Sequence, residues 1–199
     1  MKRTLLTLTL VTFCLFGIAQ TAQQEQIQAL KDGLILVRLK TKEHTIKKMR
    51  EKGLTKEAER KAIKQHDFNM NIVRSFNVHY NYSSVLFFYS RHSDEIKTGN
   101  YVGFLLDSNL IPIKDIDVDS NKTFVVDVGD VFIEIYGTHF EGLLVMDTDF
   151  EPLEKPFPYV IRRRSGLAII QRTEAEMVMK LNKKLNDYLN KVHWELEKD

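Results

Sequence analysis

The chain has 199 residues, of which 28% are charged and 43% hydrophobic, with a formal net charge of +2 and one cysteine. This length suits one globular domain with a core of its own. The balanced charge gives no support for nucleic-acid binding, and a lone cysteine excludes an internal disulfide, a CxxC redox motif and a cysteine-rich metal site.

The first 19 residues have the pattern of a secretory signal peptide. Lys2 and Arg3 precede an apolar run over residues 4–18, and small residues suit cleavage after Ala19. This run is shorter than the about 20 residues that span a bilayer. Cleavage removes the cysteine and leaves 27 basic and 27 acidic residues. We therefore expect an exported mature chain, periplasmic or extracellular, with no transmembrane segment.

Two apolar runs predict the first strands of the domain. Residues 20–32 are polar and predict a flexible leader or a short first turn, and residues 33–199 are expected to form a single globular domain. Residues 33–40 and 84–90 are continuous apolar runs, typical of buried strands. The segment between them is long enough for a helical crossover, which predicts parallel pairing of the two strands.

The crossover is expected to contain two helices. Residues 42–52 predict a short helix that Gly53 ends. Thr55 is placed to cap a longer helix, with His66 as a hydrogen-bonded core residue in its apolar stripe. The other inward positions of this stripe are Ala58, Ala62, Met70 and Val73. Residues 76–82 are either the end of this helix or an edge strand.

Beyond residue 100 the apolar runs are short and separated by turn signals, which indicates an antiparallel meander. The predicted strands are residues 101–107, 122–128, 131–137 and 142–147. Gly129-Asp130 and residues 138–141 are predicted turns, and residues 159–162 a further short strand. Aspartates alternate with apolar residues over 115–119, which favours an edge strand over a calcium loop.

The C-terminal segment predicts the clearest helix. Thr173 and Glu176 have the spacing of a capping box. The inward stripe that follows contains Val178, Leu181, Leu185, Leu189 and Val192. The predicted fold class is thus α/β (α+β): one β-helix-β unit, then an antiparallel meander. A mixed sheet of about five to six strands is packed by helices, including the amphipathic C-terminal one.

The sequence carries no motif for a nucleotide, a serine nucleophile or a zinc-binding helix. We expect no cofactor and no metal site, and the balance favours a protein that is not an enzyme. Two loops nevertheless contain residues that would supply a base and an acid if they met. These residues are His92, Asp94, Glu95, His139 and Glu141. The alternative is that each is an ordinary loop residue.

A proline-rich segment leads into a run of three arginines. Prolines fix φ and remove a backbone donor, so residues 155–158 are expected to be extended, with Phe157 or Tyr159 anchored in the core. The arginines are Arg162, Arg163 and Arg164. They either pair with the acidic segment 107–154, which has twelve acidic and two basic residues, or bind an anionic ligand or partner.

Several segments resemble an uncharacterised group of small exported bacterial proteins. They are LILVRLKT at 34–41, SSVLFFYS at 83–90 and LLVMDTDFEPLEKPFPYVIRR at 143–163, together with the signal and the closing helix. The group has no assigned activity. The resemblance therefore implies export and carries over no catalytic residue.

The sequence favours an exported, non-catalytic domain that binds an unidentified protein or anionic ligand. Charge is segregated along the chain, since residues 38–64 contain eleven basic and four acidic side chains. Such asymmetry creates local fields that attract partners. Two alternatives remain open: a hydrolase or metal-dependent enzyme that uses the loop residues, and a structural or assembly subunit of the cell envelope that uses a sheet edge.

Overall fold

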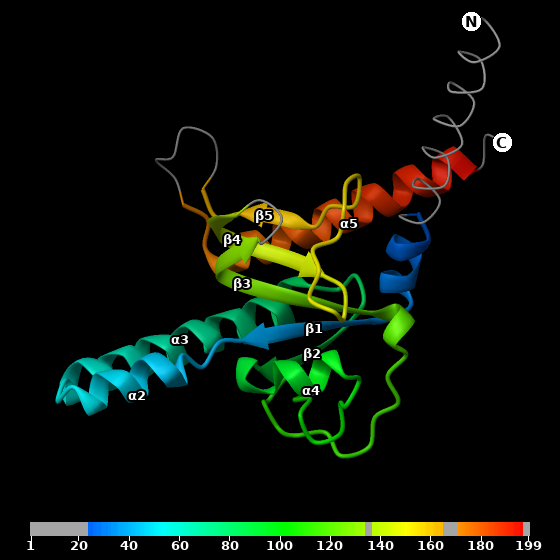
Figure 1. The fold of residues 1–199 in the computed structure, drawn as a ribbon. Coiled ribbons are helices and arrows are strands. Elements are labelled where there is room, and N and C mark those ends of the chain that lie inside the picture. Colours follow the sequence, from blue (N-terminus) through cyan, green and yellow to red (C-terminus); the bar gives the residue numbers. More distant parts are fainter. Residues whose placement is uncertain (1–23, 134–136, 165–170, 197–199) are drawn as a thin grey trace, which may run out of the picture.

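The computed structural model describes residues 24–133, 137–164 and 171–196 (Figure 1). Five strands form a sheet in the order β2-β1-β3-β4-β5. They are β1 (Leu34–Leu39), β2 (Ser84–Tyr89), β3 (Thr123–Ile133), β4 (Thr138–Met146) and β5 (Val160–Arg162). β1 is parallel to both of its neighbours, whereas β4 runs antiparallel to β3 and β5. The predicted α+β fold with a mixed sheet is confirmed. The predicted signal peptide lies outside the described residues.

Helices pack on the sheet from both sides. The helical segments are residues 24–31, α2 (Glu43–Glu51), α3 (Thr55–His79), α4 (Ser93–Lys97) and α5 (Glu174–Leu196). Short 3-10 turns, η1 (Ser90–His92) and η2 (Ser120–Lys122), follow β2 and precede β3. α3 and α5 share one apolar core with the sheet, and α4 joins a second core on the other face (Figure 1). None of the helices in the described ranges is both long and apolar enough to cross a bilayer.

The C-terminal helix α5 begins at the predicted capping box. The N–H of Thr173 donates to Glu176 Oε2 over 2.7 Å, and the N–H of Glu176 donates to Thr173 Oγ1 over 3.2 Å. The predicted stripe is buried throughout, at Val178, Leu181, Leu185, Leu189 and Val192. It meets side chains of α3 and the sheet in the larger core. This packing, rather than helix propensity, holds α5 in place.

The segment before β1 is more ordered than the sequence indicates. Residues 24–31, inside the predicted leader 20–32, form a helix in which Ile27 and Leu30 are fully buried. The hydroxyl of Tyr82 donates to the carbonyl oxygen of Ile27 over 2.9 Å. The expectation of a flexible leader is wrong for these residues, because two apolar side chains three positions apart share one helix face.

The crossover between β1 and β2 contains the two predicted helices. Gly53, with φ of 75°, follows the end of α2 as predicted. Leu54 rather than Thr55 occupies the N-cap position of α3, and no side chain caps that helix end. α3 continues to His79, so the helical alternative for this stretch is the correct one. β1 and β2 pair in parallel across this crossover.

Two amide side chains of α3 are buried in the core, and the predicted core histidine is not. His66 is exposed, so its prediction as a core residue is wrong. Gln65 and Asn69 are buried instead, and Gln65 Nε2 donates to Asn69 Oδ1 over 3.0 Å. Asn69 Nδ2 in turn donates to the carbonyl oxygen of Lys40 over 2.9 Å. The hydrogen bonds offset the cost of burying the two amides.

The predicted meander contains fewer turns than expected. β3 runs unbroken through Gly129, whose φ is 108°, and residues 138–141 belong to β4 rather than to a turn. Gly129 lies opposite Gly142 in the β3–β4 register. Glycine adopts positive φ without the steric cost of a side chain. Pairing with β4 on both sides of the glycine therefore keeps the strand continuous.

Two other predicted strands are absent from the described sheet. Residues 101–107 form turns, and Leu106 makes isolated bridges to Phe87 of β2 and to Pro112. Residues 115–119 are irregular and do not form the expected edge strand. Most apolar side chains in these segments pack against the second core, whereas Leu106 packs in the larger one. The apolar residues of these two segments are therefore explained by their packing in loops and need no strand.

Candidate functional site

Arg163 is held in an ion-pair cluster. Its side chain is 14% exposed and lies between Glu141 and Glu174. Nε of Arg163 is 3.0 Å from Oε1 of Glu141, an ion contact whose N–H direction misses hydrogen-bond geometry. Nη2 donates to Oε1 of Glu174. Because Glu141 belongs to the acidic segment, this arginine is paired internally.

The neighbouring arginines lie outside this cluster. Strand alternation directs Arg162 to the opposite face of β5 from Arg163. Arg162 and Arg164 are exposed, and no carboxylate in the described ranges lies within ion-pair distance of either. Arg164 forms an isolated bridge with Gln171. Of these two exposed arginines, Arg162 lines a groove.

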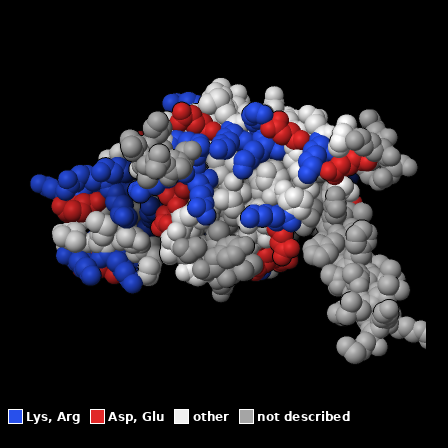
Figure 2. Space-filling model, turned by 90° about the horizontal axis from the view of Figure 1, so that it is seen from above, with Lys and Arg blue, Asp and Glu red and all other residues white. Residues whose placement is uncertain are grey.

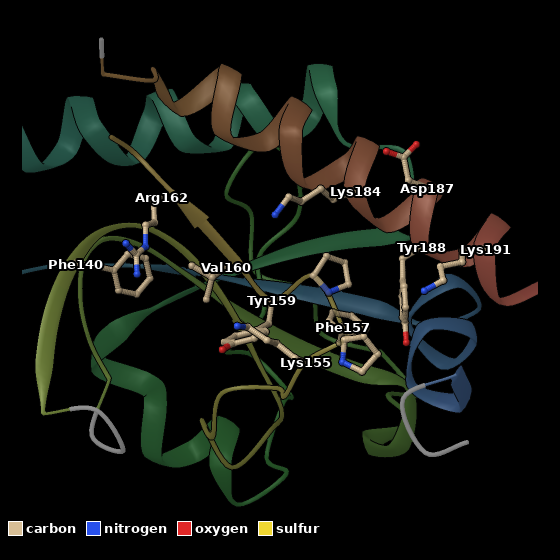
Figure 3. Close-up of a pocket in the computed structure, with 12 residues that line it drawn as sticks. Phe140, Lys155, Phe157, Tyr159, Val160, Arg162, Lys184, Asp187, Tyr188 and Lys191 are labelled. Carbon is tan, nitrogen blue, oxygen red and sulfur yellow. The ribbon is translucent and has the colours of Figure 1, made fainter. Parts of the chain in front are cut away.

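The groove lies between β5 with its preceding segment and α5, and has a volume of about 800 Å³ (Figure 3). This volume falls in the range of small-ligand sites. Its lining residues are Phe140, Lys155, Pro156, Phe157, Pro158, Tyr159, Val160, Arg162, Lys184, Asp187, Tyr188 and Lys191. Seven of these twelve come from residues 155–162, the proline-rich segment that the sequence singles out.

The proline-rich segment forms a turn instead of the expected extended lead-in. The N–H of Phe157 donates to the Glu154 carbonyl over 3.1 Å, and the N–H of Tyr159 donates to the Phe157 carbonyl over 2.9 Å. Phe157 is 1% exposed and stacks on Phe124 at 6.3 Å between centroids. Phe157 is therefore the predicted anchor, and it fixes one wall of the groove.

An aromatic side chain covers the glycine next to this wall. Phe140 and Gly142 lie on β4, and Gly142 pairs with Arg162. A Cβ at Gly142 would lie 2.8 Å from Cε2 of Phe140 and 2.3 Å from the carbonyl oxygen of Ile161. The ring thus occupies space that a side chain at Gly142 would need. It places an apolar surface beside Arg162.

The second wall is a basic face of α5. Lys184, Tyr188 and Lys191 recur at helical spacing and line the groove (Figure 3). Asp187, the acidic lining residue, is 2.6 Å from Nζ of Lys183. The pKa of Lys180 is lowered by desolvation and then by the positive charges of Arg172 and Lys184.

Tyr188 contributes an aromatic ring to the same wall. Its ring is 6.2 Å from that of Phe157, in an edge-to-face arrangement. Burial, and then the negative charge of Glu195, raise the pKa of the Tyr188 phenol. The phenol therefore stays neutral near pH 7 and can donate or accept a hydrogen bond.

The first group of catalytic candidates lies beyond the end of β2. The ring of His92 packs against that of Phe104 at a tilt of 38°, with centroids 4.7 Å apart, and its Nδ1 is 3.9 Å from Oε1 of Glu95. Nε of Arg91 donates to Nε2 of His92 over 3.1 Å. Asp94 is exposed in the first turn of α4. These contacts hold the histidine in place by packing.

The second group of catalytic candidates is on β4. Nδ1 of His139 is 3.3 Å from Oδ1 of Asp130, across the β3–β4 pair. Glu141 is the partner of Arg163. β1 and β3 lie between β4 and β2 in the sheet, so His139 and Glu141 are on a different part of the sheet from the group that follows β2. Across the described ranges, no three His, Cys, Asp or Glu residues form a group that would hold a metal ion.

A buried charge cluster, which the sequence does not reveal, lies near the end of β1. Asp127 is 5% exposed. Its carboxylate oxygens are 3.3 Å from Nη1 of Arg38 and 3.1 Å from Nζ of Lys40. Nε of Arg38 donates to Oγ of Ser93 over 3.0 Å. The three charges lie side by side because Arg38 pairs with Asp127 in the parallel β1–β3 register. Both cations therefore have the same buried carboxylate as an internal partner.

Comparison with protein-family models, curated proteins and solved structures finds no match to this chain. No residue role is therefore carried over from a relative. The candidate site rests on its own geometry: an apolar floor flanked by cations on two elements. Of its charged residues, sequence reasoning identified Arg162 and missed Lys155, Lys184 and Lys191. The 184–188–191 spacing was visible in the sequence, but only the fold brings it opposite residues 155–162.

Proposed function

We propose that the protein is an exported, non-catalytic domain that binds an anionic ligand or partner in the groove between β5 and α5. The observation that carries the proposal is an unbalanced charge around an apolar floor. Four cations line the groove, namely Lys155, Arg162, Lys184 and Lys191, against the single carboxylate of Asp187. The carboxylate of Asp187 is already paired with Lys183.

The cations of the groove differ from ordinary structural cations in their pairing. No carboxylate in the described part of the chain lies within ion-pair distance of Lys155, Arg162 or Lys184. Lys191 has a 3.6 Å contact with Glu195, in which the lysine is 62% exposed. Exposed pairs of this kind contribute little. An anionic ligand would therefore meet four available cations at little energetic cost.

The aromatic residues supply the second half of the recognition. Phe140, Phe157, Tyr159 and Tyr188 line the same space as the cations. Ligand sites typically combine such an apolar surface with a few polar groups that orient the ligand. Figure 2 shows basic side chains on the face of the molecule that contains β5 and α5, and also over the α2–α3 end. The groove is distinguished from that second area by its aromatic floor.

The test is a binding measurement on the mature chain with two labelled polyanions, a glutamate decapeptide and a sulfated dextran oligomer. Fluorescence anisotropy at about 50 and 300 mM salt should show binding that weakens with salt, since screening reduces electrostatic attraction. The double variant Arg162→Glu/Lys184→Glu should lower the affinity for at least one probe more than tenfold.

The matched control is Lys47→Glu/Lys52→Glu, which makes the same charge change at exposed positions in and just after α2. It should leave the affinity within about twofold, apart from the loss that a change in net charge causes at low salt. Equal losses in the two double variants would show non-specific attraction to a basic surface. That result, or the absence of binding by both probes, would overturn the proposal.

A further inference from the structure

The outward edge of β5 offers backbone groups to the same groove. Tyr159 accepts a hydrogen bond from the N–H of Val145, and the N–H of Arg163 donates to Glu141, so these positions face β4. Hydrogen-bonding direction alternates along an antiparallel strand. Val160 and Arg162 therefore direct their backbone groups away from β4, on the side of the groove that both residues line. The carbonyl oxygen of Arg162 already accepts a hydrogen bond from Nη1 of Arg172 over 2.8 Å, so the groups offered to a ligand are the N–H and carbonyl of Val160 and the N–H of Arg162.

We infer that the groove binds an extended acidic segment of a partner protein, which pairs with β5 as an additional strand of the sheet. The inference rests on the proposed function and specifies its ligand. An edge strand facing a helix across a groove is the arrangement in which peptides add to a sheet, with main-chain bonds for affinity and side-chain pockets for specificity. Here β5 is the edge and α5 is the facing helix.

The charges fit an acidic strand. Arg162 and Lys155 lie on the sheet side of the groove, and Lys184 and Lys191 on the helix side (Figure 3). Alternate side chains of an added strand point to opposite faces. Acidic residues of one parity would then meet the cations, while apolar residues of the other parity would contact Phe157 and Tyr188.

The prolines limit the length of the pairing. Pro158 lies two residues before Val160 and has no N–H, so the row of backbone donors along this edge cannot extend past it. From Pro158 to Arg162, four residues further on, the edge spans about 13 Å at the rise of a strand. This length matches a partner segment of about five residues. The proline also discourages uncontrolled lengthening of the edge.

The same charges disfavour a second copy of this chain as the occupant. If two β5 strands paired edge to edge, Arg162 and Lys155 of each copy would approach the same basic groove of the other. Like charges facing each other across a strand pair are destabilising. A partner of opposite charge avoids this cost, and its acidic side chains replace water around the lysines.

The experiment uses the mature chain and an eight-residue peptide that alternates glutamate and valine. Two further peptides carry N-methyl groups, one on the glutamates and one on the valines. Strand addition uses the N–H groups of one parity only, so one of these peptides should lose more than tenfold in affinity and the other less than threefold. Amide exchange of Val160 and Arg162 should slow on binding of the unmodified peptide, as followed by NMR.

The outcomes separate this inference from the proposed function. If the glutamate–valine peptide and the sulfated dextran both bind in the groove, with no parity effect and no protection of Val160 and Arg162, strand addition is overturned and anion binding stands. If dextran alone binds, the occupant is an acidic glycan and the inference is also overturned. If neither binds, both proposals fail. A parity effect together with protection supports strand addition.

Discussion

The buried charge cluster near the end of β1 and the groove along β5 contrast in how their charges are matched. In the cluster, Asp127 is 5% exposed and lies within 3.3 Å of both Arg38 and Lys40. In the groove, four exposed or half-exposed cations face one carboxylate that is paired elsewhere. The difference teaches that charge alone does not indicate a binding site. A cation that has no carboxylate partner within the protein is the better indication of such a site.

The arginine run contains both situations within two residues. Arg163 is enclosed by Glu141 and Glu174, whereas Arg162 faces the groove. Strand alternation alone separates them. The two therefore provide a matched pair for experiments, since they share residue type and are adjacent in the chain, Arg162 at the end of β5 and Arg163 just after it.

The strongest test of the contrast is removal of the buried carboxylate charge by Asp127→Asn. We expect a loss of about 3 kcal/mol in the free energy of unfolding, because Arg38 and Lys40 would keep partly buried charges without a counter-ion. Urea denaturation measures this loss. The control Asp130→Asn, at a 74% exposed side chain, should change stability by less than about 0.5 kcal/mol. A small effect of Asp127→Asn would remove the distinction between cluster and groove.

A smaller effect is expected at the arginine pair. Arg163→Met should cost about 2 kcal/mol, below the value for a fully buried pair, because water still reaches Glu141. Arg162→Met should change stability by less than about 0.5 kcal/mol and lower the affinity for the acidic peptide. Thermal unfolding and anisotropy on both variants check this. A reversal of the two phenotypes would contradict the assignment of roles within the run.

The smallest effect concerns the capping box at the start of α5 and the pH dependence of the protein's stability. Hydrogen bonds from the backbone and side chain of Thr173 lower the pKa of Glu176 below its ordinary value of 4.5. A lowered pKa means that this contribution to stability is present above about pH 4.5 and is lost as pH falls through the folded-state pKa. Glu176→Gln should therefore reduce the fall in melting temperature between pH 6 and 3. An unchanged pH profile would contradict a role for this capping box in holding α5.

Much of the fold was predictable because it depends on local patterns. The apolar runs of β1 and β2 and the α5 stripe each carry their own periodicity, and the capping box at Thr173 and Glu176 depends on four consecutive residues. The errors lie where partners distant in sequence decide. The sequence predicts a turn at Gly129, but pairing with β4 keeps this residue in a strand. The sequence predicts His66 in the core, but the packing of α3 buries Gln65 and Asn69 instead.

The candidate site was predictable only in part, for the same reason. The sequence by itself determined the α+β class, the identity of the helical stripes and the unusual proline–arginine segment, since these follow from residue type and spacing. Only the tertiary structure decided which arginine is paired and which faces the groove. That choice depends on the register of β5 with β4 and on the packing of α5, because both bring residues together across long stretches of chain.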